Sequence, residues 1–213
     1  MDEIDTWVNK VYQAMGDQKK LNGVYNNWAN TYDQHLWAMG NPFVAVAATM
    51  LSRQLPNLQA SILDAGCGTG NLGHVLYLAG YTCLSGLDPS QGMLAVANKK
   101  SIYNKLYELP LGVRDILPSR QFDAVVSTGV LTTGHASPNA IDDMLDLTKT
   151  NGFLVFSVSD HAIKNLGFSE KIFDLTKQSR WKNIERSKHF NSHPFDKSAV
   201  NAKLQIFTYQ KLA

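Results

Sequence analysis

A short apolar run followed directly by a glycine-rich turn constrains the fold of this chain more than any other feature of its sequence. Residues 62–70 read Ile-Leu-Asp-Ala-Gly-Cys-Gly-Thr-Gly, with three glycines at alternate positions, and a helical pattern follows from Asn71. Because glycine has no Cβ, its backbone can turn sharply and approach a ligand closely. In open α/β sheets, ligands bind beyond the carboxyl ends of the strands. The turn therefore predicts a ligand site at that edge of a sheet.

From about residue 60 onward, short apolar runs alternate with helical patterns, which predicts an α/β fold with a mostly parallel sheet. We expect strands at 61–64, 81–88, 106–109, 122–128 and 153–159, and helices at 71–79, 91–101, 138–150 and 169–178. Two final runs, 183–190 and 204–210, are joined by a turn around 194–197 with no helix between them, so we expect an antiparallel pair at the sheet edge. Residues 1–58 are helical in pattern and rich in tryptophan and tyrosine, and we expect them to form a lid on a core at 59–213.

The composition narrows the classes of function. The chain is 44% hydrophobic and 18% charged, as folded proteins are, and its net charge of +2 comes from scattered basic residues, so we expect no nucleic-acid partner. The start, MDEIDTWVNK, lacks the apolar region of a signal peptide, and no run approaches the ~20 apolar residues of a membrane span. We therefore expect a cytoplasmic protein without membrane contact.

No metal site or disulfide framework is expected. Cys67 and Cys83 are the only cysteines and form no C-x-x-C pair. His189 and His193 are four residues apart but lack the glutamate of an H-E-x-x-H zinc site, so we interpret them as surface or strand residues. Three aspartates at 142, 143 and 146 are interpreted as the solvated face of a helix and not as a magnesium cluster.

Two carboxylates indicate which ligand the turn binds. Free N–H groups at the helix start can hold the carboxylate of S-adenosylmethionine (SAM), and Asp64 can attract its ammonium group. Asp88 ends the second expected strand, where it can accept hydrogen bonds from both ribose hydroxyls. Residues 68–73 also match the G-x-G-x-x-G pattern of dinucleotide sites, which is the alternative. Asp64 would repel a pyrophosphate, so we interpret the turn as a SAM site.

These motifs resemble those of the class I SAM-dependent methyltransferases. Residues 63–70 are similar to motif I of that family, residues 86–94 to its ribose and adenine motif, and residues 115–118 to its D-x-L-P loop, whose acidic residue contacts the adenine amino group. Looser patterns at 122–125, 129–135 and 148–153 resemble the methyltransferase-like protein 27 (Williams-Beuren syndrome region) branch. The segment 25–33 resembles its Y-D-x-W-A-x-x-Y-D opening, with Asn26 in place of aspartate, and residues 150–152 read Thr-Asn-Gly in place of Pro-Gly-Gly.

The resemblance implies a Rossmann-like fold with seven strands, the last one antiparallel, and methyl transfer from SAM with S-adenosylhomocysteine as the product. The residues that we expect to bind the cofactor come from the lid, the turn and the ends of the strands. They are Tyr25, Trp28, Tyr32, Asp64, Ala65, Gly66, Cys67, Gly68, Thr69, Asn71, Asp88, Pro89, Met93, Asp115, Ile116, Thr128, Gly129 and Val130.

The acceptor side is expected at the loop after the fourth strand, which faces the transferred methyl group in this fold. That loop holds Thr132, Thr133 and His135, and His161 follows the fifth strand. Methyl transfer needs an acceptor lone pair in line, and a base only if the acceptor must lose a proton. His135 is the candidate catalytic base because histidine titrates near neutral pH, and the alternative is that it orders the loop by hydrogen bonding.

The aromatic residues of the lid have two interpretations. Tyr25, Trp28 and Tyr32 share one helical face by their spacing, which is also typical of a packing stripe. The resemblance places this segment over the cofactor, so we expect Trp28 and Tyr32 to contact the acceptor as well, with aromatic faces near the sulfonium charge.

The acceptor itself is expected to be a small molecule, methylated on nitrogen, oxygen or sulfur by a monomeric enzyme. Residues 127–130 read Ser-Thr-Gly-Val and do not resemble the N-P-P-Y motif of members that modify bases or glutamine. In addition, we expect no extra recognition domain, and 213 residues leave little material for the long open groove of a protein methyltransferase. Two alternatives remain: a SAM-binding protein without turnover that acts through a partner, and a protein methyltransferase.

Overall fold

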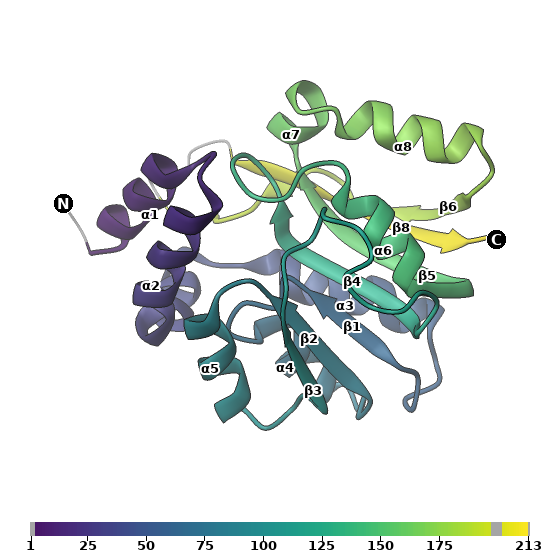
Figure 1. The fold of residues 1–213 in the computed structure, drawn as a ribbon, viewed down its shortest axis with the longest axis horizontal. Helices are drawn as coiled ribbons and strands as arrows, with labels where there is room; N and C mark the ends of the chain where they lie inside the picture. Colours follow the sequence, from purple (N-terminus) through teal and green to yellow (C-terminus); the bar gives the residue numbers. More distant parts are fainter. Residues whose placement is uncertain (1–2, 197–201, 213) are drawn as a thin grey trace.

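Short buried apolar runs form the strands of a central sheet in the computed structural model, which describes residues 3–196 and 202–212 (Figure 1). The strands run in the order β3-β2-β1-β4-β5-β8-β6. Their bounds are β1 (Ile62–Ala65), β2 (Leu84–Asp88), β3 (Lys105–Glu108), β4 (Phe122–Leu131), β5 (Thr148–Ser159), β6 (Trp181–Arg186) and β8 (Lys203–Lys211). The short β7 (Phe190–Asn191) pairs with β8 only.

The direction of the strands confirms the predicted fold class. β1 pairs in parallel with β2 and β4, β2 pairs in parallel with β3, and β4 pairs in parallel with β5. β8 is antiparallel to both of its neighbours, β5 and β6. The fold is thus α/β, with a mostly parallel sheet and an antiparallel last strand. The run expected as one strand over 183–190 is divided between β6 and β7, and Lys197, in the expected turn, lies outside the described residues.

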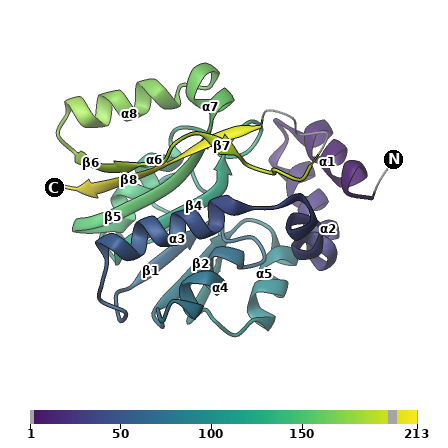
Figure 2. The ribbon, with the colours of Figure 1, turned by 180° about the vertical axis from the view of Figure 1, so that it is seen from behind.

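Helices cover both faces of the sheet, each over its own apolar cluster. α3 (Pro42–Gln54) and α4 (Asn71–Leu78) bury Val44, Leu51 and Leu76 against one face (Figure 2). α6 (Ala140–Leu147), α7 (Asp160–Asn165) and α8 (Phe168–Lys177) cover the other face, where Met144 and Phe168 are fully buried. α5 (Gln91–Lys99) follows β2 and packs against β2, β3 and α2.

The first two helices form a separate layer at one edge of the molecule. α1 (Glu3–Ala14) and α2 (Gln18–Met39) bury Val11, Leu21 and Trp28 between them, at the left of Figure 1. α2 begins where the Asp17 side chain accepts a hydrogen bond from the N–H of Lys20 at 3.1 Å, as an N-cap does. α3 lies within the segment expected as a lid but packs on the sheet, and the division of the chain at residue 58 remains a prediction.

The helix expected over 138–150 is shorter than predicted. α6 begins at Ala140, and Ser137 and Pro138 form a turn before it. The helix ends at Leu147, because Thr148 pairs with Phe122 of β4 and so begins β5. The interpretation of Asp143 as a solvated residue is wrong, since its side chain is buried and accepts hydrogen bonds from the N–H groups of Gly112 and Arg114.

Candidate functional site

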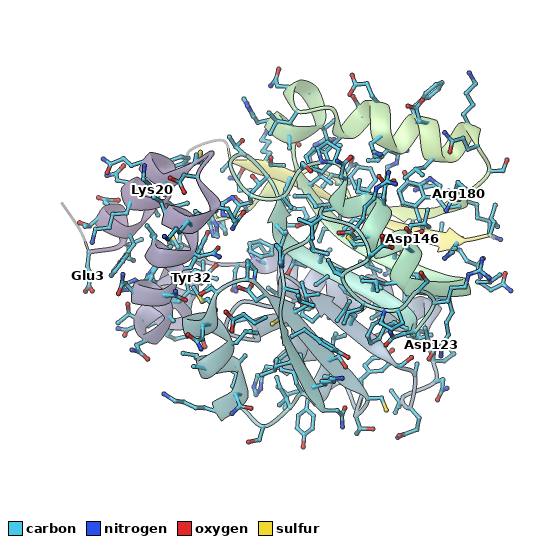
Figure 3. The ribbon with its side chains drawn as sticks, in the orientation of Figure 1. Glu3, Lys20, Tyr32, Asp123, Asp146 and Arg180 are labelled. Carbon is cyan, nitrogen blue, oxygen red and sulfur yellow. The ribbon has the colours of Figure 1, made fainter. Side chains whose placement is uncertain are left out.

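A cavity of about 330 Å³ lies where β1, β2 and β4 end. The parallel strand order brings five segments to its walls, although they are far apart in the sequence. These segments are α2 (Tyr25 and Tyr32), the glycine-rich turn (Gly66, Cys67, Gly68 and Thr69), the end of β2 (Asp88 and Pro89), the loop after β3 (Pro110 and Leu111) and the end of β4 with its loop (Thr128, Gly129, Val130 and His135). Figure 3 labels Tyr32 on α2. Asn71 and Met93, also expected at the cofactor, line the cavity as well.

The glycine-rich turn has a backbone that only glycine adopts easily. Gly66, Gly68 and Gly70 have φ of 78°, 54° and 88°. A Cβ on Gly66 would lie 2.2 Å from a methyl carbon of Val130, whereas a Cβ on Gly68 would meet no atom within 4 Å. Gly68 therefore faces the open cavity, and its missing side chain leaves room that a ligand can fill.

The carboxylate of Asp88 joins the turn to β2. Its Oδ2 accepts a hydrogen bond from the N–H of Gly68 at 2.9 Å, and its Oδ1 accepts one from the N–H of Ser90 at 2.8 Å. Burial raises the pKa of Asp88 to about 6, while these two hydrogen bonds act in the opposite direction. Each carboxylate oxygen keeps a lone pair, so Asp88 can accept two hydroxyl groups, as its predicted ribose role requires.

Asp64 lies beneath the turn and does not line the cavity. Its Oδ2 accepts hydrogen bonds from the Tyr103 hydroxyl at 2.6 Å and from the N–H of Gly73 at 3.1 Å. Its Oδ1 is buried and has no hydrogen-bond partner within the described residues. Burial raises the pKa of Asp64 to about 7. A buried carboxylate oxygen without a donor fits the predicted role of attracting an ammonium group from a ligand, directly or through water.

A cluster of polar side chains connects α2 to the glycine-rich turn, and it was not among the predicted contacts. The Thr69 hydroxyl donates to the carboxylate of Asp33, and the Lys100 ammonium lies 2.7 Å from the other Asp33 oxygen. Lys100 also donates to Asn71 at 3.1 Å. Asp33 is the last residue of the segment 25–33, which resembles Y-D-x-W-A-x-x-Y-D. That motif is the feature of the sequence that could have indicated this contact.

Asn26 makes a second link between α2 and the site. Its Oδ1 accepts hydrogen bonds from the Ser90 hydroxyl and from the N–H of Gly92, both at 2.8 Å. A Cβ on Gly92 would lie 2.7 Å from Cα of Asn26, so the two helices approach very closely here. Although the resembling motif has aspartate at this position, the asparagine oxygen fills the same acceptor role.

On the acceptor side, His135 faces Tyr25. The Nδ1 of His135 lies 2.9 Å from the carbonyl oxygen of Thr133, which can only accept, so Nδ1 carries the proton. Burial lowers the pKa of His135, which favours the neutral ring. Its Nε2 is then an acceptor, and the Tyr25 hydroxyl donates to it at 2.7 Å. The site thus favours a neutral imidazole whose Nε2 accepts a hydrogen bond from Tyr25 of α2.

Trp28 does not line the cavity, although it was expected to contact both cofactor and acceptor. Its side chain is 4% exposed and stacks on Trp7 with ring centroids 5.9 Å apart. Its indole N–H donates to Nδ1 of His35 at 2.8 Å. These contacts favour the packing interpretation for Trp28, while Tyr25 and Tyr32 of the same stripe do reach the cavity.

Several other predicted residues also lie outside the cavity walls. Asp115 is exposed, and Pro110 and Leu111 form the wall that the D-x-L-P loop was expected to supply. Ala65 is buried within β1, and Ile116 packs on the core beside α6. The remaining three residues lie in the loop after β4 or on α7. The Thr132 hydroxyl donates a hydrogen bond to the Ser159 hydroxyl, and the Thr133 carbonyl accepts one from His135. His161 is exposed on α7.

Within the described parts of the chain, no group of three or more His, Cys, Asp or Glu side chains is arranged to hold a metal ion. His189 is exposed and its Nδ1 lies 2.8 Å from Asp160, and His193 donates from Nδ1 to the carbonyl of Gly40. Among these same residues, no helix is both long and apolar enough to cross a bilayer.

Comparison with known proteins confirms the resemblance found in the motifs. The sequence model of a family described as "methyltransferase domain" matches residues 42–204. Human methyltransferase-like protein 27 is 34% identical over 152 residues, which are 70% of this chain and 61% of that protein. A tRNA U34 carboxymethyltransferase of a Shewanella species is 32% identical over 99 residues, which are 45% of this chain and 30% of that enzyme. The chain thus spans less than two thirds of the length of these relatives.

The fold is also shared with solved structures. Magnesium protoporphyrin IX methyltransferase from Synechocystis PCC 6803, crystallised with SAM, superposes with a TM-score of 0.64 at 16% identity, covering 89% of this chain and 96% of that one. A TehB-like SAM-dependent methyltransferase from Corynebacterium glutamicum superposes equally well, with a TM-score of 0.64 at 20% identity over 88% of this chain and 97% of the other. At these identities the likeness confirms the Rossmann-like fold.

Proposed function

This chain belongs to the family of SAM-dependent methyltransferase domains, and on that premise we propose that it transfers a methyl group from SAM to a nitrogen, oxygen or sulfur atom of a small molecule. The observation that carries the proposal is the cavity at the glycine-rich turn. Gly68 leaves open space there, Asp88 offers two acceptor oxygens, and a buried oxygen of Asp64 lacks a donor.

These residues fit the parts of SAM. The backbone of Gly66 to Gly68 would lie against the methionine portion, Asp88 would hold the ribose hydroxyls, and Met93 with Leu111 would flank the adenine. When bound, SAM supplies a methyl group activated by the sulfonium. Apolar and aromatic walls from Tyr32, Val130 and their neighbours would keep water from competing for that methyl.

His135 and Tyr25 would act on the acceptor. His135 is neutral, so its Nε2 has a lone pair that can take a proton. The Tyr25 hydroxyl donates to that lone pair, and an acceptor hydroxyl or amine can replace it. Either the acceptor bonds Nε2 directly, or Tyr25 stays between them and relays the hydrogen bond. The alternative that His135 only orders the loop is supported by its hydrogen bond to Thr133.

A labelling experiment tests the proposal. The protein is incubated with SAM carrying a radioactive methyl group and with three separated fractions of a cell extract: metabolites, proteins and RNA. We expect label in the metabolite fraction. Label in protein would support the protein-methyltransferase alternative, label in RNA would support an acceptor like that of the tRNA-modifying relatives, and SAM binding without any labelling would support a role without turnover. That the enzyme acts as a cytoplasmic monomer remains a prediction.

A further inference from the structure

The charge of the cavity restricts the acceptor. Of the described residues that line it, none is lysine or arginine, and Asp88 is the one carboxylate. Lys100, on α5's C-terminal side, turns its ammonium to Asp33 and Asn71. Lys20, at the start of α2, pairs with Asp17 in solvent. Among the described residues, the walls of the cavity therefore offer no cationic side chain to bind a carboxylate or a phosphate group.

The part of the cavity left to an acceptor is largely apolar. Once the turn, Asp88 and the loop after β3 are assigned to SAM, the walls that remain include Tyr25, Tyr32, Leu36, Phe43 and His135, which we call the acceptor end. Phe43 reaches the end of β4, since a Cβ on Gly129 would lie 3.8 Å from its ring. The side chains of Leu36 and Phe43 are only 7% and 6% exposed, so neighbouring side chains hold them in place at this end of the cavity.

Burial disfavours a positive charge on His135, at the acceptor end, and on His193, which packs against Phe43 from outside the cavity walls. Burial lowers the pKa of His135, and it also lowers that of His193, whose ring lies edge-on to Phe43 with centroids 5.7 Å apart. His193 donates its Nδ1 proton to the carbonyl of Gly40 at 2.9 Å. Neither ring therefore supplies a positive charge near neutral pH.

The loaded site also lacks net positive charge. SAM carries one net positive charge, which comes from its sulfonium, and the carboxylate of Asp88 offsets it. For an anionic acceptor that leaves water, the sulfonium would be the one positive charge nearby, already offset by Asp88, and no lysine or arginine among the described wall residues would add to it, which is unfavourable in a buried site. An uncharged acceptor with an apolar or aromatic body suffers no such loss and gains from contact with the acceptor end.

From this charge balance and these walls, we infer that the methyl acceptor is an uncharged molecule with an apolar or aromatic body and a hydroxyl, a thiol or a weakly basic nitrogen directed at His135 and Tyr25. The inference rests on the proposed methyl transfer and adds the substrate class. It separates this chain from enzymes whose acceptors are free carboxylates or nucleic acids, because those sites must accommodate negative charge close to the reacting atom.

The test uses a metabolite extract that is separated by charge before the reaction. Passage over anion- and cation-exchange columns near pH 8 gives anionic, cationic and unretained pools. Each pool is incubated with the full chain and SAM carrying a labelled methyl group. We expect at least ten times more labelled product from the unretained pool than from the anionic one. The Asp88→Ala variant, run in parallel with SAM below its saturating concentration, serves as the control and should label the same pool at least tenfold more slowly.

Each result bears on a different claim. Labelling chiefly in the anionic or the cationic pool overturns the substrate class and leaves methyl transfer standing. An absence of labelling in every pool, with SAM binding intact by calorimetry, overturns the proposed transfer. A binding measurement without turnover complements these: benzamide and benzoate, which have nearly the same shape, are titrated into the protein saturated with S-adenosylhomocysteine. We expect benzamide to bind at least tenfold more tightly, and equal or tighter binding of benzoate contradicts the inference.

Discussion

Replacing Gly68 by alanine should have two separate effects, one on the free energy of unfolding and one on the affinity for the cofactor. Gly68 has φ of 54°, and a Cβ there would meet no protein atom within 4 Å. The substitution should therefore cost only the left-handed backbone penalty, about 1–2 kcal/mol of unfolding free energy. In the complex, the same methyl group would occupy space that the cofactor needs, and overpacking typically costs about 1–3 kcal/mol. That amounts to roughly a 5- to 150-fold loss of affinity.

Gly16 offers a matched control, because its φ is 84° and a Cβ there also meets nothing within 4 Å, but it lies between α1 and α2 and does not line the cavity. Gly16→Ala should lower stability as Gly68→Ala does and leave the affinity for S-adenosylhomocysteine unchanged. Urea unfolding gives the stability and calorimetry gives the affinity. Equal affinities for the two variants would refute the placement of the cofactor against Gly68.

Three further predictions follow from other contacts. Asp88→Ala should weaken binding of S-adenosylhomocysteine by about 1.5–3 kcal/mol in calorimetry, since hydrogen bonds to a charged group are lost, and an unchanged affinity would make Asp88 a structural turn residue. Trp28→Ala should lower the unfolding free energy by about 3–5 kcal/mol with little change in cofactor affinity, because Trp28 is buried away from the cavity; a loss confined to affinity would restore its lid role. Burial raises the pKa of Asp64 to about 7, so the folded chain holds that proton to higher pH than the unfolded one, and stability should fall as pH rises from about 4 to about 7. Asp64→Asn should reduce this slope in urea titrations and leave the part due to Asp88, whose pKa burial raises to about 6, and an unchanged slope would show that Asp64 does not contribute.

The parts of the site that could be predicted from the sequence are local in the chain. The turn at 62–70 specifies its own backbone through three glycines, and the end of β2 places Asp88 beside it by strand pairing alone. The fold class followed for the same reason, because alternating apolar runs and helical patterns are short-range signals.

The contacts that were missed join distant segments. Tyr103 reaches Asp64 across 39 positions of sequence, and Asp33 reaches Thr69 across 36, and neither pair has a spacing that marks it. The spacing of Tyr25, Trp28 and Tyr32 predicts that they share one face of α2. It does not indicate which of them line the cavity and which contact α1. Trp28 faces Trp7 of α1, whose position depends on packing that no local pattern specifies.

The end of α6 illustrates a further limit. Thr148 continues the helical spacing of Ile141 and Met144, which is why the helix was predicted to extend past it. Its backbone instead joins β5, where it pairs with Phe122, and its hydroxyl donates to the Met144 carbonyl at 2.7 Å. Tertiary pairing thus overrides a short periodic pattern.

The central claim is that the cavity at the glycine-rich turn binds SAM, and calorimetric titration of the full chain tests it most directly. We expect SAM and S-adenosylhomocysteine to bind with one site per chain and to raise the melting temperature, as a ligand of the folded state does. NADH, the ligand of the alternative dinucleotide interpretation, should give no heat. Tight binding of NADH with no heat from either SAM or S-adenosylhomocysteine would contradict the account.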